Sequence, residues 1–183
     1  SVGLFFTDEP PRATPYKLVL ASSRIDIPAG AADHVVESSY RLPVPVQVLG
    51  VIPHAHYLGK QLHGFAELPN GTTQWLIRID DWNFNWQGDY RFAEPLILPA
   101  GTVLRQRFTY DNSEANPRNP HRPPQRTTFG PNTTDEMGEL WIQVLPASRD
   151  DYQTLNRDYG RTTLTQRLAD LTRQVAAAPD RAA

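Results

Sequence analysis

Short apolar runs, broken by proline, glycine or asparagine, constrain the fold of this chain more than any other feature. Most of them alternate apolar and polar residues, which is typical of strands with one buried face. Asn70-Gly71, between two of the runs, indicates a tight hairpin turn. The 183 residues also include 17 prolines and 11 glycines, which favour many turns. The runs lie at 16–21, 25–30, 35–42, 46–52, 61–68, 73–79, 96–98, 103–110 and 140–145. This spacing predicts an all-β fold, a jelly-roll-type β-sandwich.

The pattern changes after Pro146. Ser148 followed by two aspartates is a helix start, with a hydroxyl cap and an acidic first turn. The later apolar positions recur at the amphipathic period of a helix; they are Leu155, Tyr159, Leu164, Leu168, Leu171 and Val175. We therefore expect two parts, a β-sandwich domain at 1–147 and a helical C-terminal extension at 148–183. The apolar stripe either docks on the sandwich or begins a longer helical structure.

Composition excludes several classes of protein. The formal net charge is −2 with both signs interspersed, so no nucleic-acid-binding surface is expected. No apolar run approaches the ~20 residues of a membrane span. The chain has no cysteine, which rules out disulfides and thiol redox chemistry. Its abrupt start leads us to expect a piece of a longer protein.

Two histidines, His54 and His56, follow the apolar run 46–52. In an extended strand, residues two apart point to the same face, so the two imidazoles should lie side by side with Ala55 turned away. Two convergent imidazoles are most simply interpreted as metal ligands. The alternative is a pair of structural histidines that face solvent or bond to backbone.

The segment Asp135-Glu136-Met137 lies far downstream, before the run 140–145, and contains the only methionine. Alone, Met137 would be interpreted as a core residue. Together, His54-Ala55-His56-Tyr57-Leu58-Gly59-Lys60 and Asp135-Glu136-Met137 resemble the second copper domain of the copper type II, ascorbate-dependent monooxygenases, the family of peptidylglycine α-hydroxylating monooxygenase and dopamine β-hydroxylase. The resemblance covers about residues 38–146. It implies one copper ion per chain, bound by His54, His56 and Met137.

The chemistry of this donor set agrees with copper. A thioether is a soft ligand and imidazole a borderline one, which suits copper and cuprous copper above all. Structural zinc would normally take cysteines or a fourth hard or borderline ligand. Three protein ligands also leave a coordination position open for oxygen, water or substrate.

The resemblance implies an oxygen-activating domain of a monooxygenase that hydroxylates a C–H bond, using O2 and electrons from ascorbate or another donor. The family's electron-relay copper is bound by three histidines of a preceding domain, and this chain has no such cluster, so we expect an upstream relay domain. The alternatives are a non-catalytic copper-binding module for storage, delivery or sensing, and a structural sandwich with a vestigial site. Lack of cysteine suggests a bacterial relative, which in this family acts outside the cytoplasm, in the periplasm or secreted.

The chain also departs from the family. The arginine that binds the substrate carboxylate in peptide-hydroxylating members is replaced by Ile52, and the residues expected after the methionine by Glu139 and Trp141. A peptide ending in glycine is therefore not the expected substrate, which stays open. His63 and His121 are further histidines that could add a ligand, although a structural or solvated role is the simpler interpretation. The proline-rich loop at 112–125 could wall the site.

Overall fold

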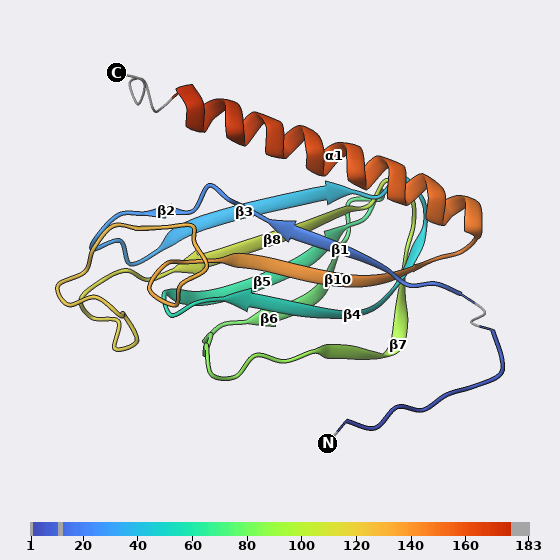
Figure 1. Cartoon of the computed structure of the whole chain (residues 1–183), viewed down its shortest axis with the longest axis horizontal. Coiled ribbons are helices and arrows are strands. Elements are labelled where there is room, and N and C mark those ends of the chain that lie inside the picture. The colour runs from blue at the N-terminus through green and yellow to red at the C-terminus, as the bar shows by residue number, and fades with distance from the viewer. Residues whose placement is uncertain (1, 11–12, 177–183) are drawn as a thin grey trace.

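The computed structural model describes residues 2–10 and 13–176, which form two four-stranded antiparallel sheets and a long helix (Figure 1). The first sheet contains, in spatial order, β1 (Tyr16–Ala21), β10 (Gly138–Pro146), β4 (Val46–Ala55) and β7 (Tyr90–Leu98). The second contains β3 (His34–Arg41), β8 (Val103–Tyr110), β5 (Gly59–Glu67) and β6 (Thr73–Ile79). A two-residue pair, β2 (Asp26–Ile27) with β9 (Thr127–Thr128), lies outside both sheets.

The strand order is that of a jelly roll. If the eight long strands are numbered in sequence, omitting β2 and β9, the sheets read 1-8-3-6 and 2-7-4-5. Consecutive strands thus alternate between the sheets, apart from the β5–β6 hairpin, as two Greek keys require. The predicted jelly-roll-type sandwich is confirmed.

The core lies between the sheets, and strand alternation fills it. On β10, Leu140, Ile142 and Val144 are buried whereas Gln143, between the last two, is exposed. On β4, Val48 and Val51 are fully buried on either side of a bulge in the pairing with β7. Each such side chain stabilises the fold by roughly 1.5–3 kcal/mol through removal from water.

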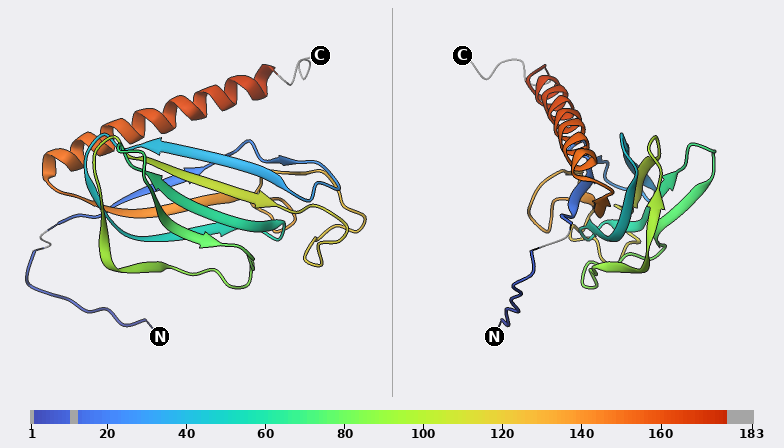
Figure 2. Two further views of the ribbon diagram at one scale, coloured as in Figure 1. Left: turned by 180° about the vertical axis from the view of Figure 1, so that it is seen from behind. Right: turned by 90° about the vertical axis from the view of Figure 1, so that its right-hand side faces the viewer.

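The helix α1 (Arg149–Ala176) covers the edge where β1 and β3 lie side by side (Figures 1 and 2). Ser148 caps it as predicted, because its Oγ accepts from the Asp151 N–H at 3.1 Å. The Tyr159 hydroxyl bonds to both the N–H and the C=O of Val19 on β1, at 2.8 and 2.9 Å. On β3, the Tyr40 hydroxyl donates to Asp158 at 2.8 Å. The helix therefore satisfies backbone N–H and C=O groups of an edge strand that would otherwise be open to pairing with another chain.

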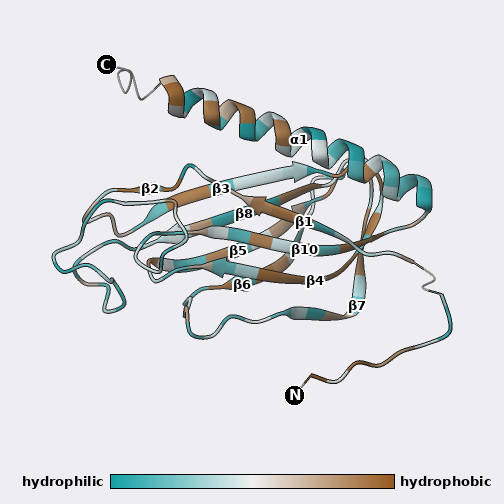
Figure 3. Cartoon of the chain, in the orientation of Figure 1, coloured by the Kyte–Doolittle hydropathy of each residue, from teal (hydrophilic) through white to brown (hydrophobic). Residues whose placement is uncertain are grey.

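Only the first half of α1 has its apolar stripe buried. Leu155 is fully buried and Tyr159 packs against the core, as their shared face predicts. The later stripe faces solvent, and Figure 3 shows apolar residues continuing along that half; Leu164, Leu168, Leu171 and Val175 are 58, 56, 48 and 75% exposed. The last residues of the predicted extension, 177–183, lie outside the described part of the chain.

Several strands differ from their predicted bounds. β4 continues through Pro53 and His54 to Ala55, β10 is longer at both ends, and β7 begins at Tyr90, inside the aromatic-rich stretch 81–90. The predicted strand 25–30 is reduced to the two residues of β2, and β9 was not predicted. β7 is an edge strand with only Leu98 buried, so it lacks the apolar alternation by which strands are recognised. Within residues 2–10 and 13–176, no helix is long and apolar enough to cross a membrane, as predicted.

Candidate metal centre

The histidine pair and Met137 come together at one end of the sandwich because β4 and β10 are antiparallel neighbours. Ala55 pairs with Gly138 and His54 with Glu139, so β4 ends where β10 begins. His56 directly follows β4, and Met137 directly precedes β10. In Figure 1 this is the end where the loops of residues 112–137 gather.

The two imidazoles lie next to each other, as the two-residue spacing predicts. Their ring centroids are 5.2 Å apart, and the rings meet edge to face at 82°. Pro53 and Ala55 point into the core, so His54 lies on the outer face of the sheet, partly exposed. His56 is 4% exposed, and the side chain of Met137 is half-buried.

Both rings are held through the same nitrogen. His54 Nδ1 lies 2.6 Å from Gln87 Oε1, and His56 Nδ1 lies 3.0 Å from the carbonyl oxygen of Asp135. The Gln87 amide is oriented because its Nε2 donates to the carbonyl of Phe84 at 2.9 Å. Both partners of the rings are thus acceptors, which places the proton on Nδ1 of each ring. In this tautomer the lone pair of each ring lies on Nε2, the arrangement that metal-ligating histidines usually have.

Burial favours the neutral form of His56. Desolvation lowers the pKa of its imidazole, and the neighbouring His54 acts in the same direction, whereas the carbonyl of Asp135 opposes the shift. A neutral imidazole is the form that binds a metal ion.

A buried carboxylate, Glu136, joins the two segments of the site. It is fully buried and accepts backbone N–H bonds from His56, from Leu58 at 3.0 Å and from Met137 at 2.8 Å. Burial raises the pKa of Glu136 to about 7, although the three N–H donors act to lower it. One side chain therefore fixes the backbone of both candidate ligand segments.

The aromatic stretch and the proline-rich loop form the surroundings of the site. Trp82 is buried and its Nε1 donates to the carbonyl of His56 at 3.1 Å, and the ring of Phe84 lies 5.8 Å from that of His56. From the loop, Arg118 bonds to the Trp82 carbonyl and to Asp81, and His121 Nε2 lies 3.4 Å from the carbonyl oxygen of Thr134. The loop thus contacts both segments that flank the histidine pair.

The two remaining histidines, His34 and His63, lie away from this site. His63 is on β5 of the second sheet, 2.9 Å from an Asp80 carboxylate oxygen and packed edge-on against Trp75. His34 begins β3. In the described part of the chain, no three His, Asp or Glu side chains come together as a metal site. A metal ion here would therefore depend on the two histidines and the thioether of Met137.

A groove of about 290 Å³ lies on the outer face of the same sheet as His54. Ile52, two residues before His54, is 42% exposed in it. Trp141 is also in its wall, held by a 2.7 Å bond from its Nε1 to Glu139, and Lys17 Nζ lies 4.0 Å from the centroid of the Trp141 ring. Ile52 and Trp141 thus give the groove apolar surface, and Lys17, Asp89 and Arg91 add charged groups to its lining.

Sequence reasoning missed the role of Gln87 and the bonding of Glu136. Gln87 belongs to an irregular segment in which no spacing predicts which ring it will reach. Glu136 is part of the motif, but its three backbone donors come from segments about 80 residues apart.

No family model and no curated protein matches this chain. Among solved structures, a chain in the structure of infectious bursal disease virus, Gx strain, matches with a TM-score of 0.37 and 10% sequence identity. The match covers 81% of this chain and 37% of the viral chain. A likeness of this degree carries no conclusion about function, which therefore has to be argued from the site.

Proposed function

We propose that this chain is the copper-binding, oxygen-activating domain of a monooxygenase that hydroxylates a C–H bond. Its ligands are His54, His56 and Met137, and it binds one copper ion. The observation that carries the proposal is the common orientation of the two histidines, each held at Nδ1 by an oxygen acceptor, which leaves the ring's lone pair on Nε2. Electrons come from ascorbate or another donor through a domain outside this chain, and the protein acts outside the cytoplasm.

The donor set fits copper better than zinc. Two imidazoles and a thioether match the preference of cuprous ion for soft and borderline ligands. The chain has no cysteine to make a tetrahedral zinc site. When bound here, copper supplies one-electron redox chemistry towards O2.

The chain's own residues have separable tasks in this proposal. Gln87 and the Asp135 carbonyl orient the rings, and Glu136 holds their backbone. Ile52 and Trp141 give the neighbouring groove apolar surface for the part of the substrate that is hydroxylated.

A second candidate is a non-catalytic module that stores, delivers or senses copper. The observation that favours it is the position of His54, partly exposed on the outer face of the sheet. A partner protein that exchanges copper could reach it there. Metal binding alone does not separate the two candidates, so they need different experiments.

The first experiment tests copper. Purified protein should bind one copper per chain and hold cuprous ion more tightly than zinc. Met137→Ala should weaken cuprous binding most, by at least about tenfold, because it removes the soft ligand. His54→Ala and His56→Ala should also weaken it, whereas His63→Ala, a matched histidine far from the site, should not. Stoichiometric zinc in both the wild type and Met137→Ala, or an equal loss in His63→Ala, would reject the copper site.

The second experiment separates enzyme from carrier. Hydroxylation needs two electrons per O2 and one copper stores one, so ascorbate should reduce the copper-loaded chain while turnover stays very slow. The intact protein, with its donor domain, should form product from a panel of C–H substrates. His54→Ala or His56→Ala in that protein should abolish product formation. Equal rates of product formation with and without the two histidines would reject the enzyme and leave the copper-carrying module as the remaining candidate.

A further inference from the structure

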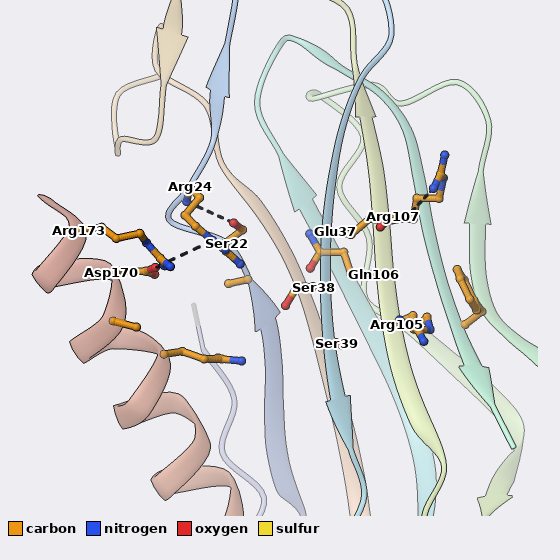
Figure 4. A pocket seen from close by; sticks show the side chains of 14 residues that line it. Ser22, Arg24, Glu37, Ser38, Ser39, Arg105, Gln106, Arg107, Asp170 and Arg173 are labelled. Atoms are coloured by element: carbon orange, nitrogen blue, oxygen red, sulfur yellow. Dashed lines mark hydrogen bonds and ion pairs between the residues drawn. The ribbon is translucent and has the colours of Figure 1, made fainter. Parts of the chain in front are cut away.

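A second cavity, of about 420 Å³, lies between the later half of α1 and the sandwich edge formed by β1 and β3 (Figure 4). Its size falls in the usual range for small-molecule sites. Its lining residues come from β1 and the turn after it, β3, β5, β8 and α1, and none of them belongs to the candidate metal centre.

The inner wall of this cavity holds a buried side chain without partners. Gln106 of β8 is 1% exposed, and neither its Nε2 nor its Oε1 has a hydrogen-bond partner. It pairs in register with Ser38 of β3, and Figure 4 shows both side chains turned towards the space between β3 and β1. An unpaired buried amide costs roughly 1–3 kcal/mol, so a group that donates to it and accepts from it would recover this free energy.

The mouth of the cavity is held in place by α1. Asp170 accepts a 2.7 Å bond from the Ser23 hydroxyl and lies 4.0 Å from Arg24 Nε, which fastens the helix to the turn after β1. The hydrogen bond from Ser23 and the neighbouring Arg173 keep the pKa of Asp170 below its usual value, so its carboxylate is ionised at neutral pH. Ala169, one residue earlier, is exposed at the mouth.

The charged side chains around the cavity are already paired, although four arginines share three carboxylates. Arg107 pairs with Glu37 at 2.6 Å, and Arg105 with Glu67 at 2.7 Å. Arg24 and Arg173 both pair with Asp170. An ionic ligand would therefore have to compete with these existing pairs. The inner wall also offers the Gln106 amide and the Ser38 hydroxyl, which are neutral and can both donate and accept.

We propose that this cavity binds a small, neutral, polyhydroxylated molecule of the monosaccharide or polyol type, with its hydroxyl groups on Gln106 and Ser38. Hydroxyl groups satisfy the donor and the acceptor of a primary amide at once, which a carboxylate or an ammonium group cannot do. This proposal does not rest on the proposed copper chemistry.

The test is a titration of the metal-free protein with a panel of neutral monosaccharides and polyols. Binding is monitored by calorimetry and by NMR of the Gln106 side-chain amide. We expect saturable binding by at least one of them and a shift of that amide signal. Gln106→Met, similar in volume but apolar, should weaken this binding by about tenfold or more, because the bonds to the ligand are lost. Gln143→Met, at an exposed glutamine on β10, should bind like the wild type.

A second variant covers the case in which Gln106→Met does not fold. Ala169→Trp adds bulk at the exposed mouth without touching the core, and it should also block binding. Three results would overturn the proposal. The first is binding of acetate or phosphate in preference to the neutral probes. The second is undiminished binding of the neutral probe by Ala169→Trp. The third is that no probe reaches saturation and the NMR signal of the Gln106 amide shows contact with water alone.

Discussion

Gln87 shows at the scale of single residues how a polar side chain prepares a site. Its Nε2 is engaged by the carbonyl of Phe84, so its Oε1 faces His54 Nδ1. This orientation fixes both the tautomer and the direction of the ring before any metal ion arrives. On β8, Gln106 carries the same functional group without a hydrogen-bond partner, and the proposed polyol site is built on this amide.

Replacement of Gln87 tests this role. We expect Gln87→Leu to weaken copper binding by about 10–100-fold, the usual effect of losing a bond that orients a metal-binding histidine. The measurement is a competition titration with a cuprous chelator. Gln74→Leu, at an exposed glutamine on β6, is the matched control. An unchanged affinity in Gln87→Leu would mean that the ring is oriented by other contacts.

The helix α1 is the element that turns an open sandwich edge into a closed one. Edge strands with free N–H and C=O groups invite pairing with other chains. Here the Tyr159 hydroxyl is hydrogen-bonded to both the N–H and the C=O of Val19. Its ring packs edge-on against the rings of Tyr16 and Tyr40, with centroid distances of 6.0 and 5.2 Å respectively. The contact thus joins one helix to both sheets.

Loss of one hydroxyl should weaken this contact measurably. Tyr159→Phe keeps the ring but leaves both backbone groups of Val19 unbonded, so we expect the free energy of unfolding to fall by about 1–3 kcal/mol. Urea unfolding measures it. Tyr152→Phe is the control, because the Tyr152 hydroxyl makes no hydrogen bond within the described residues while its ring packs on Tyr16. Equal losses in the two variants would assign the effect to the rings alone.

At the scale of the whole molecule, the jelly roll separates the two proposed sites. The metal centre lies where β4 ends and β10 begins, and the polar cavity lies along the β1–β3 edge under α1. The first site depends on loops between strands, whereas the second exists only while the helix is docked.

Removal of the residues after Ala147 tests this division. The shortened chain should keep its β-sheet circular dichroism and lose its helical signal, because all helix in the described chain lies in α1. Its free energy of unfolding should fall by at least about 2 kcal/mol, since the burial of Leu155 is lost. Light scattering should detect self-association through the uncovered edge. A helical signal that survives the truncation would contradict the assignment.

The sequence by itself determined most of the strands, the sandwich and the start of the helix. Alternation is a local property that depends on which residues meet the core, and it placed β1, β6 and β8 at their observed bounds. Period-two spacing likewise predicted that the His54 and His56 rings lie side by side. Ser148 was recognisable as a cap because capping needs only neighbouring residues.

Only the tertiary structure decided what surrounds these elements. The pairing of β4 with β10 brings Met137 to His56 across about 80 residues, and no local rule specifies that pairing. The first part of β7 could not be recognised because an edge strand buries little on either face. Gln87, Glu136 and Gln106 acquired their roles in the same way. A polar side chain becomes a bridge, an orienting group or an unpaired amide according to which distant groups the fold brings within hydrogen-bond distance.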